Sequence, residues 1–143
     1  METFSHETLS PDWVTGFTEG LGSFTFSRSG KQVAVYFALK LPLVDRLLLE
    51  SIQRFFGGIG RLYEVRTTNN GAIYYRVSNR SELLAIVGYF DQHPLRTSKV
   101  RVYDVWRLMV LAKQQFRNVD KFEINALADQ ISRLTRPTAP TPK

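Results

Sequence analysis

Residues 13–24 constrain the fold most strongly, because they predict a helix that runs directly into a strand. Pro11 and Asp12 suit the start of this helix, since proline is preset for a first turn and an acid complements the helix dipole. Gly16 and Gly20 are four residues apart and therefore share one helical face. Each glycine costs a soluble helix about 1 kcal/mol relative to alanine. We infer that this face allows another backbone to approach closely.

The rest of the chain alternates between helical and extended patterns in an order typical of the α+β class. Two predicted hairpins form one antiparallel sheet with helices on one side of it. Residues 11–135 are expected to form a single domain, between a polar lead-in at residues 1–10 and a disordered tail of Pro and Thr at residues 136–143. The expected elements are a helix to residue 21, strands 23–27 and 32–41, a helix that starts at Pro42, strands 61–66 and 73–77, and helices 81–91, 100–116 and 120–134.

Segment 32–41 has the clearest period-two pattern in the chain, which predicts a strand with one buried face and one open face. Its apolar side comprises Val33, Val35, Phe37, Leu39 and Leu41. The opposite sheet face is expected to carry Thr25, Ser27, Gln32, Tyr36, Lys40, Tyr74 and Arg76. This face is polar, partly aromatic and basic, which suits a protein that reads nucleic-acid grooves. A merely solvated face of an antiparallel sheet is the alternative.

The charge balance favours a polyanionic partner, because the 143 residues carry a formal net charge of +6 and a pI near 9.8. The chain has no cysteine, which excludes disulfides and thiolate metal sites and allows a reducing compartment. No apolar run approaches the roughly 20 residues that span a membrane. The N-terminus lacks a signal-peptide pattern. We therefore expect an intracellular protein with no membrane partner.

Segment 14–22 resembles the motif of the LAGLIDADG homing endonucleases. The resemblance continues through residues 37–40, the Leu-rich second helix, the glycine turn at 57–60, residues 75–78 and the loop 94–99, and so spans residues 9–134. It implies an α-β-β-α-β-β-α unit whose sheet forms half of a saddle over DNA. A chain with one motif copy works as a homodimer in this family. The implied dimer interface is the motif helix, with Thr15, Gly16, Glu19 and Gly20.

One departure from the family pattern concerns the chemistry of cleavage. The family places an Mg²⁺-binding acid immediately before the last glycine of the motif, where this sequence has Leu21. Magnesium requires oxygen ligands, which leucine does not supply. Glu19 lies about 200° around the helix from Leu21 and therefore points elsewhere. We expect no metal site and no cofactor.

Two further positions bear on the same chemistry through the resemblance. Leu41 stands where the family often has a polar residue near the end of the second strand, and Lys99 matches a lysine near the family's active site. No intact catalytic set is therefore expected, although Lys99 is retained. These positions predict a pseudoenzyme that keeps the scaffold of the family.

Four hypotheses follow for the function. The first is a DNA-binding homodimer without cleavage, whose base contacts come from the open sheet face and whose phosphate contacts come from Lys31, Arg66 and Lys99, with Arg28 as a further nucleic-acid contact. The second is an RNA binder, either maturase-like or a structural protein on ribosomal RNA, because Tyr36, Tyr63 and Tyr74 can stack bases. The third is an active endonuclease with a rearranged site, and the fourth is a basic protein with no nucleic-acid role. The family is common in organelles and microbial introns, which makes a mitochondrion or plastid possible.

Overall fold

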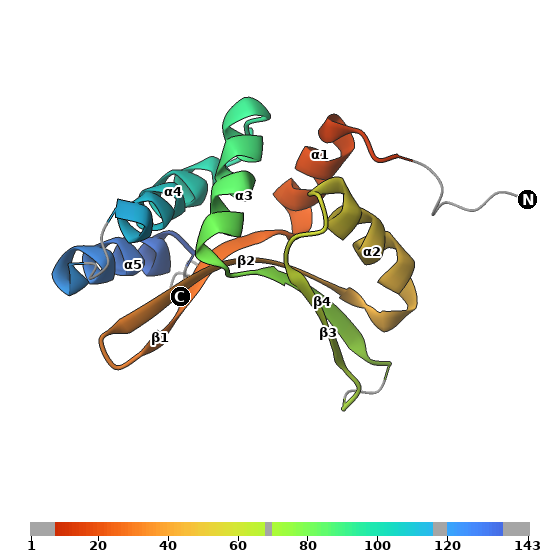
Figure 1. Cartoon of the computed structure of the whole chain (residues 1–143), viewed down its shortest axis with the longest axis horizontal. Helices are drawn as coiled ribbons and strands as arrows, with labels where there is room; N and C mark the ends of the chain where they lie inside the picture. The colour runs from red at the N-terminus through yellow and green to blue at the C-terminus, as the bar shows by residue number, and fades with distance from the viewer. Residues whose placement is uncertain (1–7, 68–69, 116–119, 136–143) are drawn as a thin grey trace, which may run out of the picture.

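The computed structural model describes residues 8–67, 70–115 and 120–135. The expected lead-in lies largely outside these residues, and the expected tail lies wholly outside them. Within them, no helix is long and apolar enough to cross a membrane. The elements in chain order are α1 (Pro11–Leu21), β1 (Ser23–Ser29), β2 (Gln32–Pro42), the 3-10 helix η2 (Leu43–Asp45), α2 (Arg46–Phe55), β3 (Arg61–Val65), β4 (Ala72–Val77), α3 (Arg80–Gln92), α4 (Lys99–Gln115) and α5 (Lys121–Thr135) (Figure 1).

The helix-to-strand unit predicted at the start of the chain is confirmed. Ser10 caps α1, and its Oγ accepts a hydrogen bond from the Trp13 N–H at 3.1 Å. Pro11 occupies the first helical position, as expected. Gly22 follows Leu21 in an extended conformation, so the chain passes from α1 into β1 without a loop.

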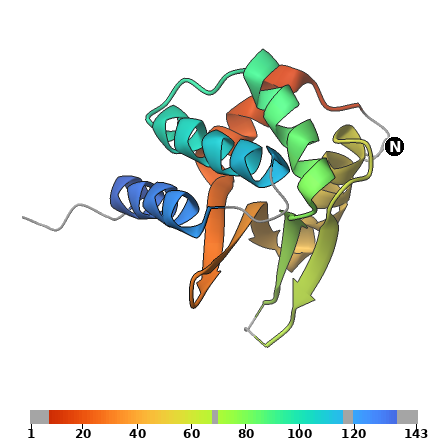
Figure 2. The same cartoon turned by 60° about the vertical axis from the view of Figure 1, so that its left-hand side comes forward.

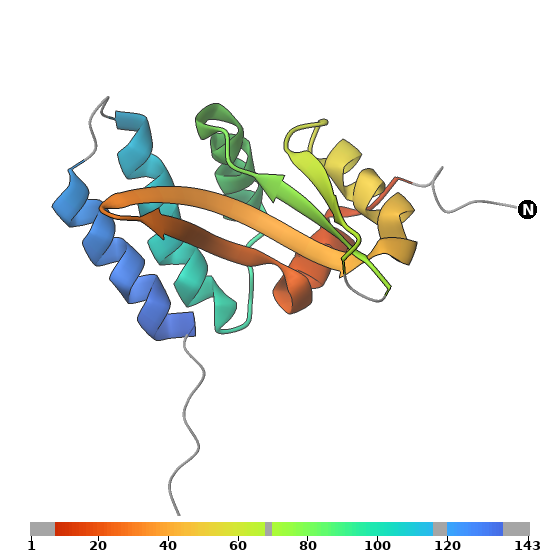
Figure 3. The same cartoon turned by 90° about the horizontal axis from the view of Figure 1, so that it is seen from below.

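The strands form one antiparallel sheet in the order β1-β2-β4-β3. All the helices lie on one side of this sheet, and the strands arch beneath them (Figure 1). The view from below shows the other face in front, with the helices behind it (Figure 3). The α+β class and the antiparallel sheet predicted from the sequence are confirmed.

The core lies between the sheet and the helices. The five apolar side chains predicted to share one face of β2 are all buried. Phe24 packs edge-to-face against Phe90 and Trp106, with ring centroids 5.2 and 5.1 Å apart. The buried Trp106 donates from Nε1 to the carbonyls of Thr25 and Tyr36 at 3.1 and 3.0 Å. These contacts fix α4 against the middle of the β1–β2 hairpin.

The expected start of the second helix at Pro42 is wrong. Pro42 is the last residue of β2, with an extended backbone, and the turn of η2 separates it from α2, which begins at Arg46. The Leu43 N–H donates to the Gly71 carbonyl at 3.3 Å, so the chain stays tied to the β3–β4 hairpin where the helix was expected. Proline suits both a first helical turn and a strand end, and the local sequence does not separate the two.

Candidate nucleic-acid interface

The open face of the sheet contains a groove that all four strands line. Because facing residues of an antiparallel pair share one face, the registers Thr25↔Tyr36, Lys40↔Tyr74 and Tyr63↔Tyr74 bring residues from distant segments together. None of the lining residues is acidic. They are Leu21 at the end of α1, Ser23 and Thr25 on β1, Tyr36, Ala38, Leu39 and Lys40 on β2, Tyr63 and Val65 on β3, and Tyr74 and Arg76 on β4.

Two cations lie over aromatic rings in this groove. The Arg76 guanidinium carbon is 3.7 Å from the centre of the Tyr36 ring, and the Lys40 ammonium is 5.5 Å from that of Tyr74. These contacts orient the cations without neutralising them. Arg61 lies directly opposite Arg76, and like charges in that relation destabilise a strand pair. A bound anion would relieve this repulsion.

The structure brings five of the predicted base contacts, Thr25, Tyr36, Lys40, Tyr74 and Arg76, into the groove. Ser27 and Gln32 share the open face through their registers with Ala34 and Ser29, and lie further out on the β1–β2 hairpin. The sequence reasoning missed Ser23, Ala38, Arg61 and Val65 and gave Tyr63 a role only for RNA. Alternation within 61–65 signals two faces, but only the pairing with β4 shows which face is open.

Arg28 and Arg66 do not join the groove. Arg28 pairs with Val33 in the register and so projects to the helix side of the sheet, where its Nη2 lies 3.0 Å from Asp129 Oδ1 on α5. Arg66 follows β3 and donates to the Glu64 carboxylate at 2.6 Å from Nη2. Of the predicted phosphate contacts, Lys31 lies exposed at the tip of the β1–β2 hairpin. Strand alternation turns the Arg28 side chain away from the open face, so a nucleic-acid contact from it stays a prediction.

Lys99 caps the end of α1, and Glu19 of α1 binds the loop just before α4. Lys99 Nζ donates to the Thr18 and Gly22 carbonyls at the end of α1, at 3.1 and 2.6 Å. The Glu19 carboxylate accepts hydrogen bonds from the Arg96 and Thr97 N–H groups and from Thr97 Oγ1, the last at 2.6 Å, just before α4 begins. The two side chains thus tie the end of α1 to the start of α4. Lys99 directs its ammonium toward the carbonyl oxygens of its own chain, and a phosphate contact from it stays a prediction.

Both pKa values reflect this arrangement. Burial lowers the pKa of the Lys99 ammonium, and the charge of Glu19 opposes part of that shift. Burial alone would raise the pKa of the Glu19 carboxyl, but the hydrogen bonds from Thr97 and Arg96 and the charge of Lys99 outweigh it and lower the pKa. The Glu19 carboxyl is therefore charged at neutral pH.

The residues at the end of α1 do not fit the divalent metal that the resemblance implies. Leu21 faces the groove with 49% of its surface exposed and offers no oxygen ligand. Glu19 points to the loop before α4, on another side of the helix, as its rotation predicts. In the described part of the chain, no group of three or more His, Asp or Glu residues is arranged to hold a metal ion.

Leu41 requires a correction. Its side chain is 8% exposed and lies on the helix side of the sheet, opposite Ile73 in the register. It therefore cannot face a nucleic acid on the open side, where Lys40 lies instead. Leu41 is a core residue and gives no information on lost chemistry. The case for a lost metal site rests on Leu21.

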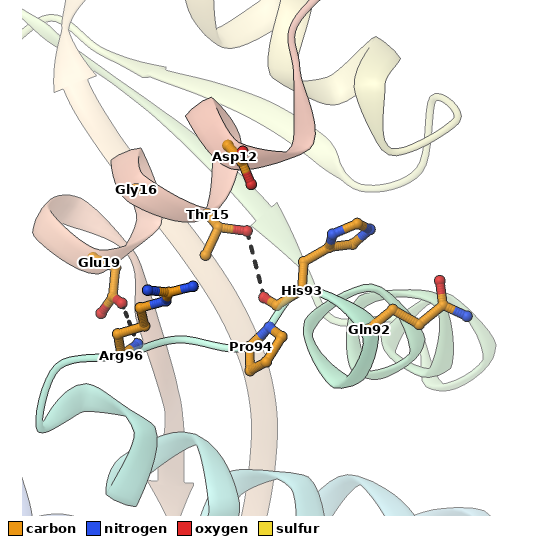
Figure 4. A pocket seen from close by; sticks show the side chains of 8 residues that line it. All are labelled: Asp12, Thr15, Gly16, Glu19, Gln92, His93, Pro94 and Arg96. Atoms are coloured by element: carbon orange, nitrogen blue, oxygen red, sulfur yellow. Dashed lines mark hydrogen bonds between the residues drawn. The ribbon is translucent and has the colours of Figure 1, made fainter.

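Gly16 and Gly20 lie on an open side of α1. Both are exposed, and a Cβ atom added to either one would have no neighbour within 4 Å. Thr15 and Glu19 of the same implied interface are instead bonded within the chain, with Thr15 Oγ1 2.9 Å from the Tyr89 hydroxyl and 3.4 Å from the His93 carbonyl. A pocket separates this side of α1 from the segment between α3 and α4 (Figure 4). The contacts of the isolated chain do not require these two glycines.

Comparisons with known proteins agree with this fold. The family model described as LAGLIDADG endonuclease matches residues 14–110. The chain is 34% identical over 124 residues to the probable intron-encoded endonuclease Cox1-I1b of Schizosaccharomyces pombe, covering 83% of this chain and 31% of that protein. It is 32% identical over 99 residues to the probable intron-encoded endonuclease 2 of Neurospora crassa, covering 64% of this chain and 22% of that protein. The chain thus spans less than a third of the length of these two relatives.

Solved structures show the same architecture. The homing endonuclease I-TnaI matches with a TM-score of 0.75 and 28% identity, over 91% of this chain and 96% of that one. I-SmaMI bound to an uncleaved DNA target matches with a TM-score of 0.76 and 26% identity, over 87% of this chain and 45% of that one. A chain with this motif helix, sheet order and similarity belongs to the LAGLIDADG endonuclease family, as the sequence resemblance indicates.

Proposed function

We propose that this protein binds duplex DNA through the open face of its sheet and does not cleave it by metal-dependent chemistry. The observation that carries the proposal is a single groove in which aromatic rings and unneutralised cations converge, with Leu21 at the end of the motif helix. In this proposal the scaffold of a homing endonuclease is kept for binding alone.

The binding half of the proposal rests on charge and shape. Arg61 and Arg76 face each other on a strand pair, which is an arrangement that phosphate groups would stabilise. Lys40 lies near them on the same face and is exposed. I-SmaMI, which has a similar fold, was solved bound to an uncleaved DNA target, and this similarity supports duplex DNA as the partner. The present chain matches 45% of the I-SmaMI chain.

The loss of cleavage rests on the chemistry of Leu21. Metal ions activate phosphodiesters by polarising their oxygens and by generating a nucleophilic hydroxide. Leu21 cannot hold such an ion, and Glu19 is engaged by Thr97 and Arg96. A pseudoenzyme is the function that these contacts favour over an endonuclease with a rearranged site.

The proposed assembly is a homodimer that is formed through α1. Gly16 and Gly20 lie exposed on one side of this helix and would let a second helix approach closely. The substitution Gly16→Leu would place a large side chain in such an interface. We expect it to convert a dimer to a monomer in sedimentation, whereas Gly88→Leu on α3 is a control whose site is also open. A wild-type monomer on its DNA would contradict this part of the proposal.

RNA binding is the second candidate, and the three tyrosines of the groove favour it. Tyr36, Tyr63 and Tyr74 present rings on which unpaired bases can stack. The role would be that of an intron maturase or of a structural protein on ribosomal RNA. Two relatives are named as intron-encoded endonucleases, which supports an intron context for this chain. A location in a mitochondrion or plastid stays a prediction.

Selection from random duplex DNA tests the proposal, in parallel with sequencing of RNA that co-purifies with the protein. We expect one enriched duplex sequence and an affinity that falls steeply with salt. Arg76→Ala serves as the binding-defective control. Enrichment of one RNA with no duplex preference would favour the second candidate, and the absence of both would leave a basic protein without a nucleic-acid role.

A further inference from the structure

The outer half of the β1–β2 hairpin is a ribbon of two strands. β4 pairs with β2 from Phe37 to Pro42, whereas residues 32–36 pair with β1 alone among the described residues. Figures 1 and 3 show this ribbon projecting beyond the rest of the sheet. An isolated two-stranded hairpin is at best marginally stable in water. The ribbon therefore needs support from another element.

α5 supplies polar contacts to this ribbon. Asp129 on α5 pairs with Arg28 of β1 at 3.0 Å, and Arg28 also donates to the Asn125 carbonyl at 3.4 Å. The Asn125 side-chain amide donates from Nδ2 to the Lys31 carbonyl at 3.2 Å, at the hairpin turn. From α4, Lys113 Nζ donates to the Val33 carbonyl. These contacts hold both strands of the ribbon and its turn.

An apolar seam lies beneath these polar contacts. Val33 and Val35 of the ribbon are each 3% exposed, and Ile124 and Ile131 of α5 belong to the same buried cluster. α5 packs against both α4 and β2, and its first turns lie beside the outer end of the hairpin in Figure 3, whereas Figure 2 shows the helix running across the hairpin. The helix is thus joined to the ribbon by buried surface as well as by hydrogen bonds.

The opposite face of the ribbon carries side chains that the proposed function assigns to DNA. Ser27 and Gln32 lie on this face, in register with Ala34 and Ser29. They lie beyond the groove, toward the outer end of the sheet. α5 itself lies outside the segment 14–110 that the family model matches. The element that supports the ribbon is thus separate from the segment that defines the family.

We propose that α5 is a positioning element for sequence recognition. Asn125 and Asp129 hold the ribbon so that Gln32 and Ser27 meet the outermost base pairs of a bound duplex. This inference rests on the proposed function, since it requires that the open face binds DNA. Asn125 and Asp129 act through the ribbon and are positioning residues.

The test compares the base preferences of the wild-type protein with those of Asp129→Ala and of the double variant Asn125→Ala/Asp129→Ala. Glu123→Ala is the matched control, because it removes an acid from an exposed position of the same helix. Since a wrong base pair commonly costs about tenfold or more in affinity, we expect preference at the outermost positions to fall about tenfold in the double variant. We expect base preference at the inner positions of the duplex to stay unchanged in the double variant. The conservative variant Asp129→Glu should keep the base preference at the outermost positions.

Hydrogen exchange of the ribbon amides provides a readout that does not depend on DNA. We expect faster exchange in residues 26–35 of the double variant and unchanged exchange in β3 and β4. A double variant that selects the same sequence with the same preference at every position would overturn the inference. A uniform loss of preference would overturn it as well. If the wild type itself selects no duplex, the proposed function fails and the inference fails with it.

Discussion

The two faces of the sheet differ in what their side chains do. On the helix side, Val35, Phe37 and Leu39 are at most 3% exposed and are packed beneath the helices. On the open side, Tyr36 and Lys40 alternate with them along β2. The Arg76 guanidinium lies over the Tyr36 ring, and the Lys40 ammonium lies over the Tyr74 ring. One face therefore determines stability, and the other is free to be selected for binding. Substitutions on the two faces should separate these properties.

The largest effect is expected from the helix side. Phe37 is fully buried and contacts Phe24 and Phe90, with ring centroids 5.2 and 5.9 Å apart. Replacing it with alanine removes this packing and leaves a cavity, so Phe37→Ala should lower the free energy of unfolding by about 3–5 kcal/mol. Urea denaturation measures this change. A loss under 1 kcal/mol would contradict the assignment of this face as the core.

The next effect is expected from the open side. Arg76→Ala removes a cation from the groove and should weaken duplex binding about tenfold or more, at a cost of about 1–3 kcal/mol. Because surface changes have small effects on folding, the free energy of unfolding should change by about 0.5 kcal/mol or less. A binding titration and a denaturation curve test the pair of outcomes. Arg54→Ala on α2 removes the same charge from the helix layer and should leave the affinity nearly unchanged.

The sequence predicted these two faces because strand alternation is a local property. The period-two pattern of 32–41 separates Phe37 from Tyr36 correctly, and it also assigns Leu41 to the core. The family resemblance counted Leu41 as a lost polar position of the cleavage site, whereas the structure buries it on the helix side of the sheet. At position 41 the period-two pattern predicted the burial correctly and the family resemblance did not. The direction of a side chain follows from its place in the strand, whatever residue type the family has there.

The contacts that the sequence did not predict join distant segments. Glu19 bonds Thr97, and Lys99 bonds the Thr18 carbonyl, across about 80 positions of the chain. No periodicity within either segment predicts these contacts. The sequence shows Arg28 only as a basic residue at a hairpin turn. Its ion pair with Asp129 forms because α5 packs beside the hairpin. The place of Arg61 on the open face follows only from its register with β4. Each of these features depends on tertiary packing or strand register.

A smaller effect concerns the connection between α1 and α4, which supports the motif helix beside the groove. Glu19→Ala removes an acceptor of several hydrogen bonds and should lower the free energy of unfolding by about 1–2 kcal/mol at pH 7. The pKa of Glu19 is lowered on folding, so its contribution is complete at neutral pH. It is lost as the pH falls from the ordinary carboxyl value of 4.5 through the lower value of the folded protein. Denaturation over a series of pH values should therefore show the full difference between wild type and variant at pH 7 and a shrinking difference as the pH falls below 4.5.

The smallest effect is expected at the tip of the hairpin. Lys31 is exposed there and is proposed to touch phosphate. Lys31→Ala should lower the slope of log affinity against log salt by about one while leaving the preferred sequence unchanged. Binding titrations over a range of salt concentrations measure the slope. An altered preferred sequence would instead indicate that Lys31 reads bases.

The central claim is binding without metal-dependent cleavage, and incubation of the selected duplex with purified protein and Mg²⁺ tests it most directly. Gel analysis should show a bound duplex with both strands intact, because Leu21 supplies no metal ligand at the end of α1. The variant Leu21→Glu, assayed alongside, shows whether the rest of the site can still use a metal. Strand cleavage by the wild-type protein that requires Mg²⁺ would contradict the account.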